Sequence, residues 1–439
     1  MNTMNNVKDF GAVGDGVTKD TAAVQRAIDA GGTVVFPPGT YLCGTLYLKS
    51  HGGLRLEAGA TLLASPDKKD YNAPDFCVQN FHSEKERADG AHFIVAVEQE
   101  NVSIEGPGRI DGNRKAFWTP PEEMPGVWPG QPWEWRPSQM LFFCECTNVR
   151  IHDVELFNTP YWTCFLHGCE YVQIHAVRVF CHQFTRNGDG LDIDCCRHVT
   201  VSDCIISSGD DCIAVRGNSK LLKKARPCEN ITITNCVMQT GGANGIRLGV
   251  GSGNSTDAIR NVTVSNCVMC GCRVGIGINA KYCGRAQMTI ENILFENLWI
   301  NAHLPIYILG SDSLDFPVRD ISFRHLRGKE AKSSILIDSS ELGEVYDINF
   351  SDVQFEWVDG GQPEPGEGPF FHSWPHPCPN GAVYVKNTRD ITFDRFRIRW
   401  KTENPAWKYG LKAIGAVGLV CRDCDFGKPD FDGNEVSVQ

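Results

Sequence analysis

The chain has 439 residues, of which 42% are hydrophobic and 44 are glycine, and it carries a formal net charge of −11 with an isoelectric point near 5.6. This composition predicts a globular chain with many turns and excludes a disordered one. The negative charge argues against nucleic acid and anionic membrane surfaces as partners, and mildly against a polyanionic substrate unless basic residues gather in the cleft.

The N-terminus, MNTMNNVKDF, has neither the basic nor the apolar region of a secretion signal, and no later stretch is long and apolar enough for a membrane span. We therefore expect a chain that is cytoplasmic, or secreted with its signal removed. Twenty cysteines are present, and several recur at one place in a repeated strand motif, as at Cys204, Cys236 and Cys267. Small, buried, reduced thiols explain this recurrence better than disulfides, and metal binding explains it less well still.

Residues 7–42 predict a Gly-rich turn, a short helix and two strands in that order. Asp20 or Thr21 suits the N-cap of a helix over Thr21–Ala30, and Gly31-Gly32 suits its end. TVVFPPGTYL then reads as strand, turn and strand. This passage is similar to the entry segment of parallel β-helix proteins that act on polysaccharides, and we expect residues 1–45 to form the N-terminal cap and first coil. A helix is needed there because an uncapped first coil is an open sheet edge.

A motif of the form Asn/Asp, Val/Ile, any residue, apolar, any residue, Asn/Asp recurs along the chain. Its copies begin at Asn101, Asn148, His198, Asn230, Asn261, Asn292, Asp320, Asp347 and Asp390. The central copies start 32, 31 and 31 residues apart (230 − 198, 261 − 230, 292 − 261), which indicates a solenoid. The alternation within each copy has the period of a strand.

One strand per coil with Gly and Asn turns predicts an all-β fold, a single-stranded right-handed parallel β-helix of the pectin-lyase-like kind. We expect one domain over residues 1–439, with roughly ten coils and columns of Asn, Cys and Ile inside. A leucine-rich horseshoe is the alternative, but its LxxLxLxxN consensus and its helical half-repeat are absent.

Two insertions interrupt the repeat. Residues 117–136 contain four tryptophans, and residues 359–379 are similar in character. Surface loops that pack their own aromatic side chains are one interpretation. A Trp-rich loop is also a stacking platform for sugar rings, which makes Trp133 and Trp135 candidate substrate contacts.

The stretch 187–216 contains three carboxylates, Asp189, Asp210 and Asp211, each beside a glycine or another aspartate. Asp211 follows Asp189 by 22 residues (211 − 189), and each is followed two positions later by an apolar residue that opens an alternating pattern. With one strand per coil these acids stack in register, about 4.8 Å apart. Acids so close repel, so at least one is expected to keep its proton to unusually high pH, which yields a general acid and a general base.

NGDGLDID and GDDCIAV resemble the signature of glycoside hydrolase family 28, the polygalacturonase family. The resemblance covers most of the chain and includes Arg136-Pro137 and the Pro160–Thr163 passage with Trp162. It implies that Asp189 and Asp211 activate a water molecule and that Asp210 is the general acid. It also implies inversion of the anomeric centre in one displacement, with no metal and no cofactor. Aspartates that merely cap turns are the structural alternative.

Two further motifs of that family are missing. Ala243-Asn244-Gly245 stands in place of Gly-His-Gly, and Gly277-Ile278-Asn279 stands in place of Arg-Ile-Lys. In the family the histidine sets the protonation of the acids, and the arginine and lysine hold the galacturonate carboxylate. The missing motifs therefore argue for a substrate other than plain polygalacturonate, and Asn244, Arg136 and Trp162 are candidate substrate contacts.

The phase of the apolar positions offers replacements for the missing cations. It places Arg247 in the column of the lost arginine, one coil earlier, and Arg216 in the column of the lost lysine, two coils earlier. Both are candidate carboxylate-binding residues. Ion pairing of Arg216 with Asp194, and of Arg247 with Asp192 or a surface acid, explains them equally well.

The leading interpretation is an inverting glycoside hydrolase that acts on a pectic or related polysaccharide or oligosaccharide. A β-helix polysaccharide lyase is a second interpretation, because the acidic trio could hold Ca²⁺. A non-catalytic glycan-binding or tailspike-like β-helix is a third. The sequence leaves the sugar, the linkage and the oligomeric state open.

Overall fold

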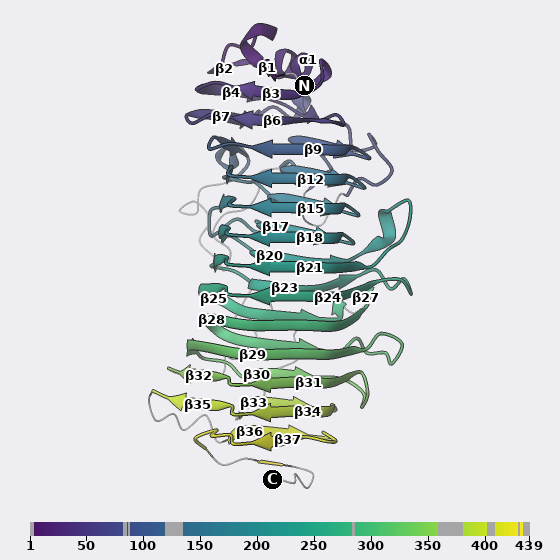
Figure 1. Cartoon of the computed structure of the whole chain (residues 1–439), viewed down its shortest axis with the longest axis vertical. Coiled ribbons are helices and arrows are strands. Elements are labelled where there is room, and N and C mark those ends of the chain that lie inside the picture. The colour runs from purple at the N-terminus through teal and green to yellow at the C-terminus, as the bar shows by residue number, and fades with distance from the viewer. Residues whose placement is uncertain are drawn as a thin grey trace. The chain divides into compact units, whose positions relative to one another are not determined.

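The computed structural model describes residues 4–81, 86, 88–118, 135–282, 286–358, 381–401, 409–428 and 431–432. Its internal contacts divide the chain into two compact units, residues 1–212 with 221–224 and residues 213–220 with 225–439. In each unit the strands of successive coils lie side by side (Figure 1). The predicted parallel β-helix is confirmed, and the predicted single domain over residues 1–439 stays a prediction. Insertion 359–379 and most of insertion 117–136 lie outside the described residues.

In its described residues the first unit has one α-helix and short strands that pair in parallel. Its helix is α1 (Thr21–Asp29), and its 3-10 turns are η1 (Val7–Phe10), η2 (Lys68–Asp70) and η4 (Arg114–Ala116). Its strands are β1 (Met4–Asn6), β2 (Asp15–Lys19), β3 (Thr33–Phe36), β4 (Gly39–Cys43), β5 (Leu46–Tyr47), β6 (Gly52–Leu56), β7 (Ala60–Ala64), β8 (Ile94–Val97), β9 (Glu100–Glu105), β10 (Arg109–Asp111), β11 (Leu141–Cys144), β12 (Thr147–His152), β13 (Glu155–Phe157), β14 (Cys164–His167), β15 (Glu170–His175), β16 (Arg178–Phe180), β17 (Leu191–Asp194), β18 (Arg197–Ser202) and β19 (Ile205–Ser208).

The second unit continues the same pattern of parallel pairs, and it includes one antiparallel pair, β26 (Lys281–Tyr282) with β27 (Ala286–Gln287). Its other strands are β20 (Ile213–Gly217), β21 (Cys228–Thr234), β22 (Val237–Thr240), β23 (Asn244–Gly251), β24 (Ala258–Ser265), β25 (Val268–Asn279), β28 (Thr289–Leu309), β29 (Val318–Ala331), β30 (Ile335–Asp338), β31 (Val345–Ser351), β32 (Gln354–Trp357), β33 (Gly381–Lys386), β34 (Arg389–Asp394), β35 (Arg397–Trp400), β36 (Tyr409–Ile414), β37 (Val420–Arg422) and β38 (Phe431–Asp432). A further 3-10 turn, η6, spans Ser219–Leu221.

Helix α1 ends one residue before the predicted Ala30 and has Asp20 at its N-cap. The Asp20 side chain makes no capping bond to the helix. It accepts hydrogen bonds from the amides of Val13 (2.6 Å) and Gly14 (2.9 Å) instead. The carboxylate therefore ties the Gly-rich turn to the start of the helix, which fixes the cap over the first coil. Among the described residues, none of the helices has the length and apolar character that crossing a membrane requires.

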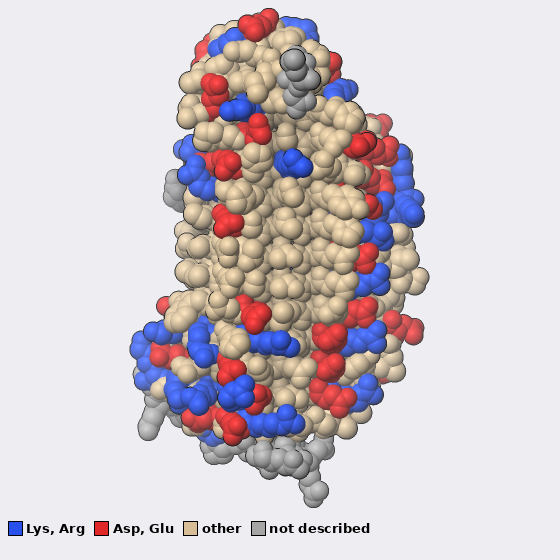
Figure 2. All heavy atoms as spheres, viewed as in Figure 1, with Lys and Arg blue, Asp and Glu red and all other residues tan. Residues whose placement is uncertain are grey.

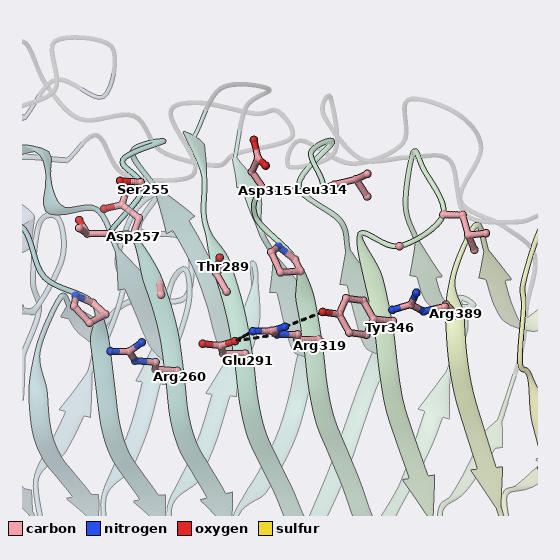
Figure 3. A pocket seen from close by; sticks show the side chains of 16 residues that line it. Ser255, Asp257, Arg260, Thr289, Glu291, Leu314, Asp315, Arg319, Tyr346 and Arg389 are labelled. Atoms are coloured by element: carbon pink, nitrogen blue, oxygen red, sulfur yellow. Dashed lines mark hydrogen bonds and ion pairs between the residues drawn. The ribbon is translucent and has the colours of Figure 1, made fainter.

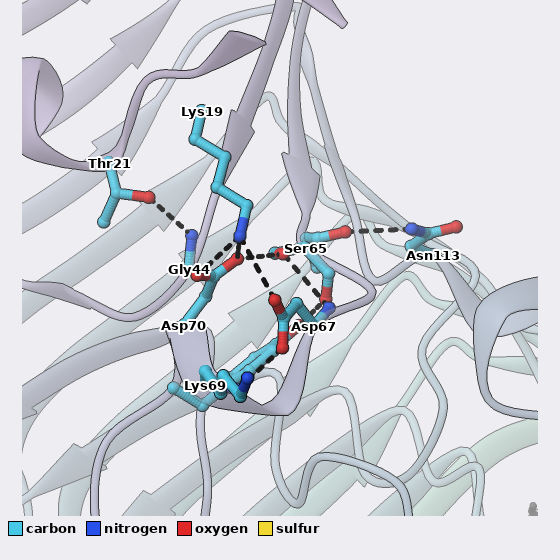
Figure 4. Close-up of polar contacts among 10 residues, drawn as sticks. Lys19, Thr21, Gly44, Ser65, Asp67, Lys69, Asp70 and Asn113 are labelled. Atoms are coloured by element: carbon cyan, nitrogen blue, oxygen red, sulfur yellow. Dashed lines mark hydrogen bonds and ion pairs between the residues drawn. The ribbon is translucent and has the colours of Figure 1, made fainter. Parts of the chain in front are cut away.

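Polar contacts around Lys19 join the end of β2 to the 3-10 turn η2 (Figure 4). Its ammonium group lies 2.8 Å from a carboxylate oxygen of Asp70 and 3.3 Å from one of Asp67. The hydrogen bond to Asp70 raises the pKa of Lys19. The Gly44 amide donates to the Thr21 hydroxyl at 2.9 Å. Because the Lys19 side chain is half exposed, its ion pairs orient these segments and add little stability.

The Asn/Asp repeat has a backbone cause. The first residue of every copy is left-handed, with φ between 53° and 60°, a conformation that Asn and Asp tolerate better than most L-residues. Stacked asparagines also bond from coil to coil, as Asn261 does to Asn230 at 2.9 Å and Asn292 to Asn261 at 2.7 Å. Each copy lies in a strand, so all nine predicted strands are confirmed.

The core of the second unit contains a stack of phenylalanines. Phe295, Phe323, Phe350 and Phe393 pair in register, with successive ring centroids 5.0, 4.6 and 5.0 Å apart. All four are fully buried. The cysteines are mostly buried as well, since only Cys77, Cys270 and Cys424 among the described ones are not, as expected for small apolar side chains.

We expect Phe323→Ala to lower the free energy of unfolding by about 3–5 kcal/mol, because it removes one of the two inner rings of a four-ring stack that cannot close around the void. Chemical denaturation followed by circular dichroism measures this loss. Val237→Ala is the matched control, since Val237 lies in the same unit and is 43% exposed. Equal unfolding midpoints for the two variants would contradict the stacking account.

Candidate active site

Asp189, Asp210 and Asp211 come together in the first unit. One carboxylate oxygen of each lies within 4.8 Å of the others, and within the described part of the chain no other group of His, Cys, Asp and Glu has metal-binding spacing. The three residues are 5%, 8% and 1% exposed, respectively. The predicted clustering of these acids is therefore present, and three carboxyl groups so close in a buried site repel one another strongly when ionised.

Two positions beside the acids must be glycine, because backbone atoms of other segments lie too close to allow a Cβ atom. A Cβ atom on Gly209 would lie 2.4 Å from the Thr185 carbonyl oxygen, and one on Gly190 would lie 2.4 Å from the Cys212 carbonyl oxygen. No side chain fits at either position. The glycines of the NGDG and GDD sequences thus allow the two acid-bearing segments to touch.

Hydrogen bonds orient the carboxyl group of Asp210. The side-chain Oδ2 of Asp210 accepts a hydrogen bond from the backbone amide of Asn187 at 3.1 Å. The backbone carbonyl oxygen of Asp210 accepts one from the Ser208 hydroxyl at 2.7 Å. The amides of Gly209 and Asp210 both donate to the Gly188 carbonyl, at 3.0 and 3.3 Å. The segment before Asp189 therefore holds Asp210 in place.

Arg136 is 1% exposed and binds the same segment. Its Nη1 donates to the carbonyl oxygens of Pro160 (3.0 Å) and Arg186 (2.8 Å). Its Nη2 donates to the Glu86 carbonyl (2.8 Å) and to Asn187 Oδ1 (3.0 Å). The guanidinium group therefore bonds to the protein itself, in the manner of a positioning residue. Direct substrate binding by Arg136 stays a prediction.

Two aromatic rings lie close to the Arg136 guanidinium group. Its Cζ lies 4.6 Å from the ring centroid of Tyr161 and 5.0 Å from that of Trp118. Burial lowers the pKa of Arg136 to about 10, opposed by the negative charges of neighbouring acidic groups that include Asp189. Arg136 is thus close enough to the acid cluster to interact with its charge.

The tryptophans predicted to contact substrate, Trp162, Trp135 and Trp133, have different surroundings. Trp162 is 5% exposed and stacks on Phe81 and Tyr161, with ring centroids 5.1 Å apart in both pairs. Trp162 therefore packs against these two aromatic rings. Trp135 is half-buried and meets the rings of Tyr71 and Phe117 edge-on, both at 5.4 Å. Trp133 lies outside the described residues. Sugar binding by all three tryptophans stays a prediction.

In the second unit the strand register supports part of the predicted cation placement. Arg247 pairs with Gly277, and Gly249 pairs with Asn279, so Arg247 lies in the column of Gly277, one coil earlier. Its side chain is half-buried. The Arg216 column is interrupted, because the register shifts between Val215 and Gly217. Arg216, which is 8% exposed, therefore does not lie directly opposite Gly249.

The structure explains why position 277 is a glycine, which the sequence pattern did not predict. A Cβ atom there would lie 2.3 Å from Asn244 Oδ1 and 2.5 Å from Tyr307 Oη. Tyr307 pairs with Gly277 on the next coil and is 1% exposed. Asn244 is 5% exposed. These two side chains occupy the space that a long residue at position 277 would need.

Two other residues support the acid-bearing segment and were also missed. Arg114 Nε donates to the Thr185 hydroxyl at 2.5 Å, and its guanidinium carbon lies 4.8 Å from the centroid of the Trp118 ring. Trp118 donates to the Pro160 carbonyl at 2.9 Å. Arg114 lies just before the Trp-rich insertion and Trp118 at its start, where the sequence has no periodic pattern.

Comparisons with known proteins agree with these observations. Residues 57–364 match the family model described as Glycosyl hydrolases family 28, and residues 4–50 match the one described as Rhamnogalacturonase A/epimerase, pectate lyase-like. Over 322 residues the chain is 28% identical to a probable polygalacturonase of Arabidopsis thaliana, an alignment that spans 70% of this chain and 62% of that protein.

Solved structures show the same fold. The family 28 exopolygalacturonase of Yersinia enterocolitica matches with a TM-score of 0.72 and 19% identity, over 95% of this chain and 78% of that one. The endo-xylogalacturonan hydrolase of Aspergillus tubingensis matches with a TM-score of 0.58 and 16% identity, over 99% and 100%. The family match includes the three clustered aspartates, and the chain belongs to glycosyl hydrolase family 28.

Proposed function

We propose that the protein is an inverting glycoside hydrolase that cleaves glycosidic bonds in a pectic or related polysaccharide or oligosaccharide. The observation that carries this proposal is the buried cluster of Asp189, Asp210 and Asp211, with oxygens within 4.8 Å of one another. Glycoside hydrolysis needs one carboxylic acid to protonate the leaving oxygen and one carboxylate to activate water or attack. Mutual repulsion in the cluster favours a state in which one group keeps its proton.

Asp210 is the general acid in this proposal, and Asp189 and Asp211 hold and deprotonate the attacking water. The Asn187 amide fixes the orientation of the Asp210 carboxyl group, which efficient proton transfer requires. Two carboxylates beside the acid suit a shared water. Inversion rests on the family resemblance alone, since oxygens within 4.8 Å of one another are closer than the about 6.5–9.5 Å of common inverting pairs and nearer the about 5–5.5 Å of retaining pairs.

The substrate we propose contains uronic acid or an attached neutral sugar and is not plain polygalacturonate. Asn244 and Tyr307 fill the space beside Gly277, so a cation cannot extend from that position. Arg247 lies in register with Gly277, one coil earlier, and is the carboxylate-binding residue of this proposal. The Aspergillus tubingensis enzyme is named an endo-xylogalacturonan hydrolase, which is consistent with such a substrate.

β-Elimination is a second candidate, because three clustered carboxylates can also hold Ca²⁺. Activity that resists a chelator and releases no unsaturated, ultraviolet-absorbing product would exclude it. A non-catalytic glycan-binding protein would bind its glycan equally well with Asp210 replaced and would release no product.

We expect Asp210→Asn to reduce kcat about 10²–10⁴-fold on a natural glycan, because general-acid assistance is lost while the fold is kept. The loss should be smallest for substrates with good leaving groups. Asp203→Asn is the control, since Asp203 lies in the same unit with a side chain 46% exposed. Full activity of Asp210→Asn on a natural glycan would disprove the assigned role.

Arg136→Met and Arg136→Lys separate the charge of Arg136 from its geometry. Both variants lose the fork that binds four acceptors, and one hydrogen bond to a charged group contributes about 1.5–3 kcal/mol, so kcat/KM should fall about tenfold or more. Met also removes a positive charge near the carboxylates. Because a lost cation makes carboxylates harder to ionise, the acidic limb of the pH profile should move to higher pH in Met alone.

Circular dichroism tests whether these two variants fold. The control is Arg178→Met, because Arg178 lies in the same unit and its side chain is 49% exposed. Unchanged rates and pH profiles in both Arg136 variants would show that Arg136 does not position the acid-bearing segment.

Arg247→Ala should lower kcat/KM about tenfold to a hundredfold on an acidic substrate, the equivalent of one bidentate arginine–carboxylate contact of about 1.5–3 kcal/mol. On a matched neutral oligosaccharide it should have little effect. Arg324→Ala, at an exposed position of β29, is the control. Equal losses on both substrates would make Arg247 a structural residue.

A further inference from the structure

A groove in the second unit is lined by residues that the proposed function does not use (Figure 3). Its volume is about 820 Å³, within the range of sites that hold small ligands. The floor is a row of side chains from neighbouring strands, namely Arg260 on β24, Glu291 on β28, Arg319 on β29, Tyr346 on β31 and Arg389 on β34. Leu314 and Leu342, from the loops above, are 56% and 49% exposed.

The floor residues form a ladder because each precedes the left-handed Asn or Asp of its repeat. They pair in register from strand to strand. The first members alternate in charge and are joined by ion pairs. Arg260 lies 2.6 Å from Glu229, and Arg319 lies 2.6 Å from Glu291. In this part of the groove each arginine has its own glutamate.

The alternation of charge breaks at Tyr346, where a further carboxylate would be expected. Arg319 Nη1 donates to the Tyr346 hydroxyl oxygen at 2.9 Å. Arg389 lies beyond Tyr346, with its guanidinium carbon 4.7 Å from the ring centroid. Among the described residues, the carboxylate that Arg389 contacts is Asp390, at 3.3 Å and with a side chain 61% exposed. At this end of the groove the ion-pair partner of Arg389 is therefore an exposed carboxylate outside the groove lining, and the acidic residue Asp315 also lines the groove.

Donors at this end suit a planar anion. The Tyr346 oxygen accepts from Arg319, so its own O–H can donate to a ligand. The Arg389 guanidinium, with a side chain 47% exposed, offers a rigid fork that matches carboxylate geometry. Leu314 and Leu342 add apolar surface at the rim, which suits the C–H face of a sugar ring.

We propose that this groove binds a uronate residue of an acidic saccharide, with the carboxylate held by Arg389 and the Tyr346 hydroxyl. The site goes beyond the proposed hydrolysis and does not depend on it. It shares no residue with the acid cluster or with Asn244, Arg247 and Arg216. Such a site would let the protein hold an acidic polymer at a second point.

Isothermal titration calorimetry of the full chain with trigalacturonate tests this proposal, using the Asp210→Asn background to prevent turnover. Arg389→Ala should weaken the groove binding event about tenfold to a hundredfold, the effect of losing one bidentate arginine contact, and Tyr346→Phe should weaken it less. Any event at the acid cluster should remain. If the proposed function fails and the acid cluster binds no uronate, the groove event persists and is still weakened by Arg389→Ala.

Arg399→Ala is a closely matched control. Lys, Arg, Asp and Glu mix over the β29–β35 part of the face in Figure 2, and Arg399, like Arg389, has a side chain 47% exposed and pairs with an aspartate, Asp425. It should bind like the parent. Identical titrations for the parent and Arg389→Ala overturn the proposal. Equal binding of methyl-esterified trigalacturonate overturns the carboxylate assignment, and equally tight binding of acetate or inorganic phosphate reassigns the groove to a small anion.

Discussion

Parallel pairing in register places each residue about 4.8 Å from its counterpart one coil away, and the rest of the structure depends on this constraint. Chemistry that repeats in the sequence therefore becomes a column in space. The same constraint stacks Phe323 between two other rings, bonds Asn261 to Asn230 and joins Arg319 to Glu291. Whether a column is apolar, hydrogen-bonded or ionic depends on which position of the repeat it occupies.

In the acid cluster the same constraint brings carboxyl groups together although their charges repel. Stacking would separate the acids by one coil, and glycines bring the backbones closer still, because Gly190 and Gly209 leave no room for a Cβ atom. The backbone amide of Asn187 donates to the Asp210 carboxyl group, and the buried positive charge of Arg136 interacts with Asp189. Rigid positioning of groups that repel is how a protein obtains an acid and a base from one residue type.

Much of this arrangement could be predicted from the sequence, since strand alternation and the Asn/Asp positions are local signals. Asp189 and Asp211 were found because their neighbours share one phase. Tyr307 was missed because its effect is steric and acts on Gly277 from the next coil. Arg216 was misaligned because Gly249 and Val250 distort the strand, with φ of 151° and 72°. Arg114 and Trp118 lie where the sequence has no period, so only the three-dimensional structure reveals their contacts.

The central claim is that the aspartates catalyse hydrolysis in a single displacement. Their separation, within 4.8 Å, is shorter than the roughly 6.5 Å or more usual for inverting pairs, so stereochemistry is the sharpest test. Proton NMR at early times, before mutarotation, reports the anomeric configuration of the newly formed reducing end. Our account predicts that the configuration is opposite to that of the cleaved bond, whereas a retained configuration would contradict it and indicate a covalent intermediate.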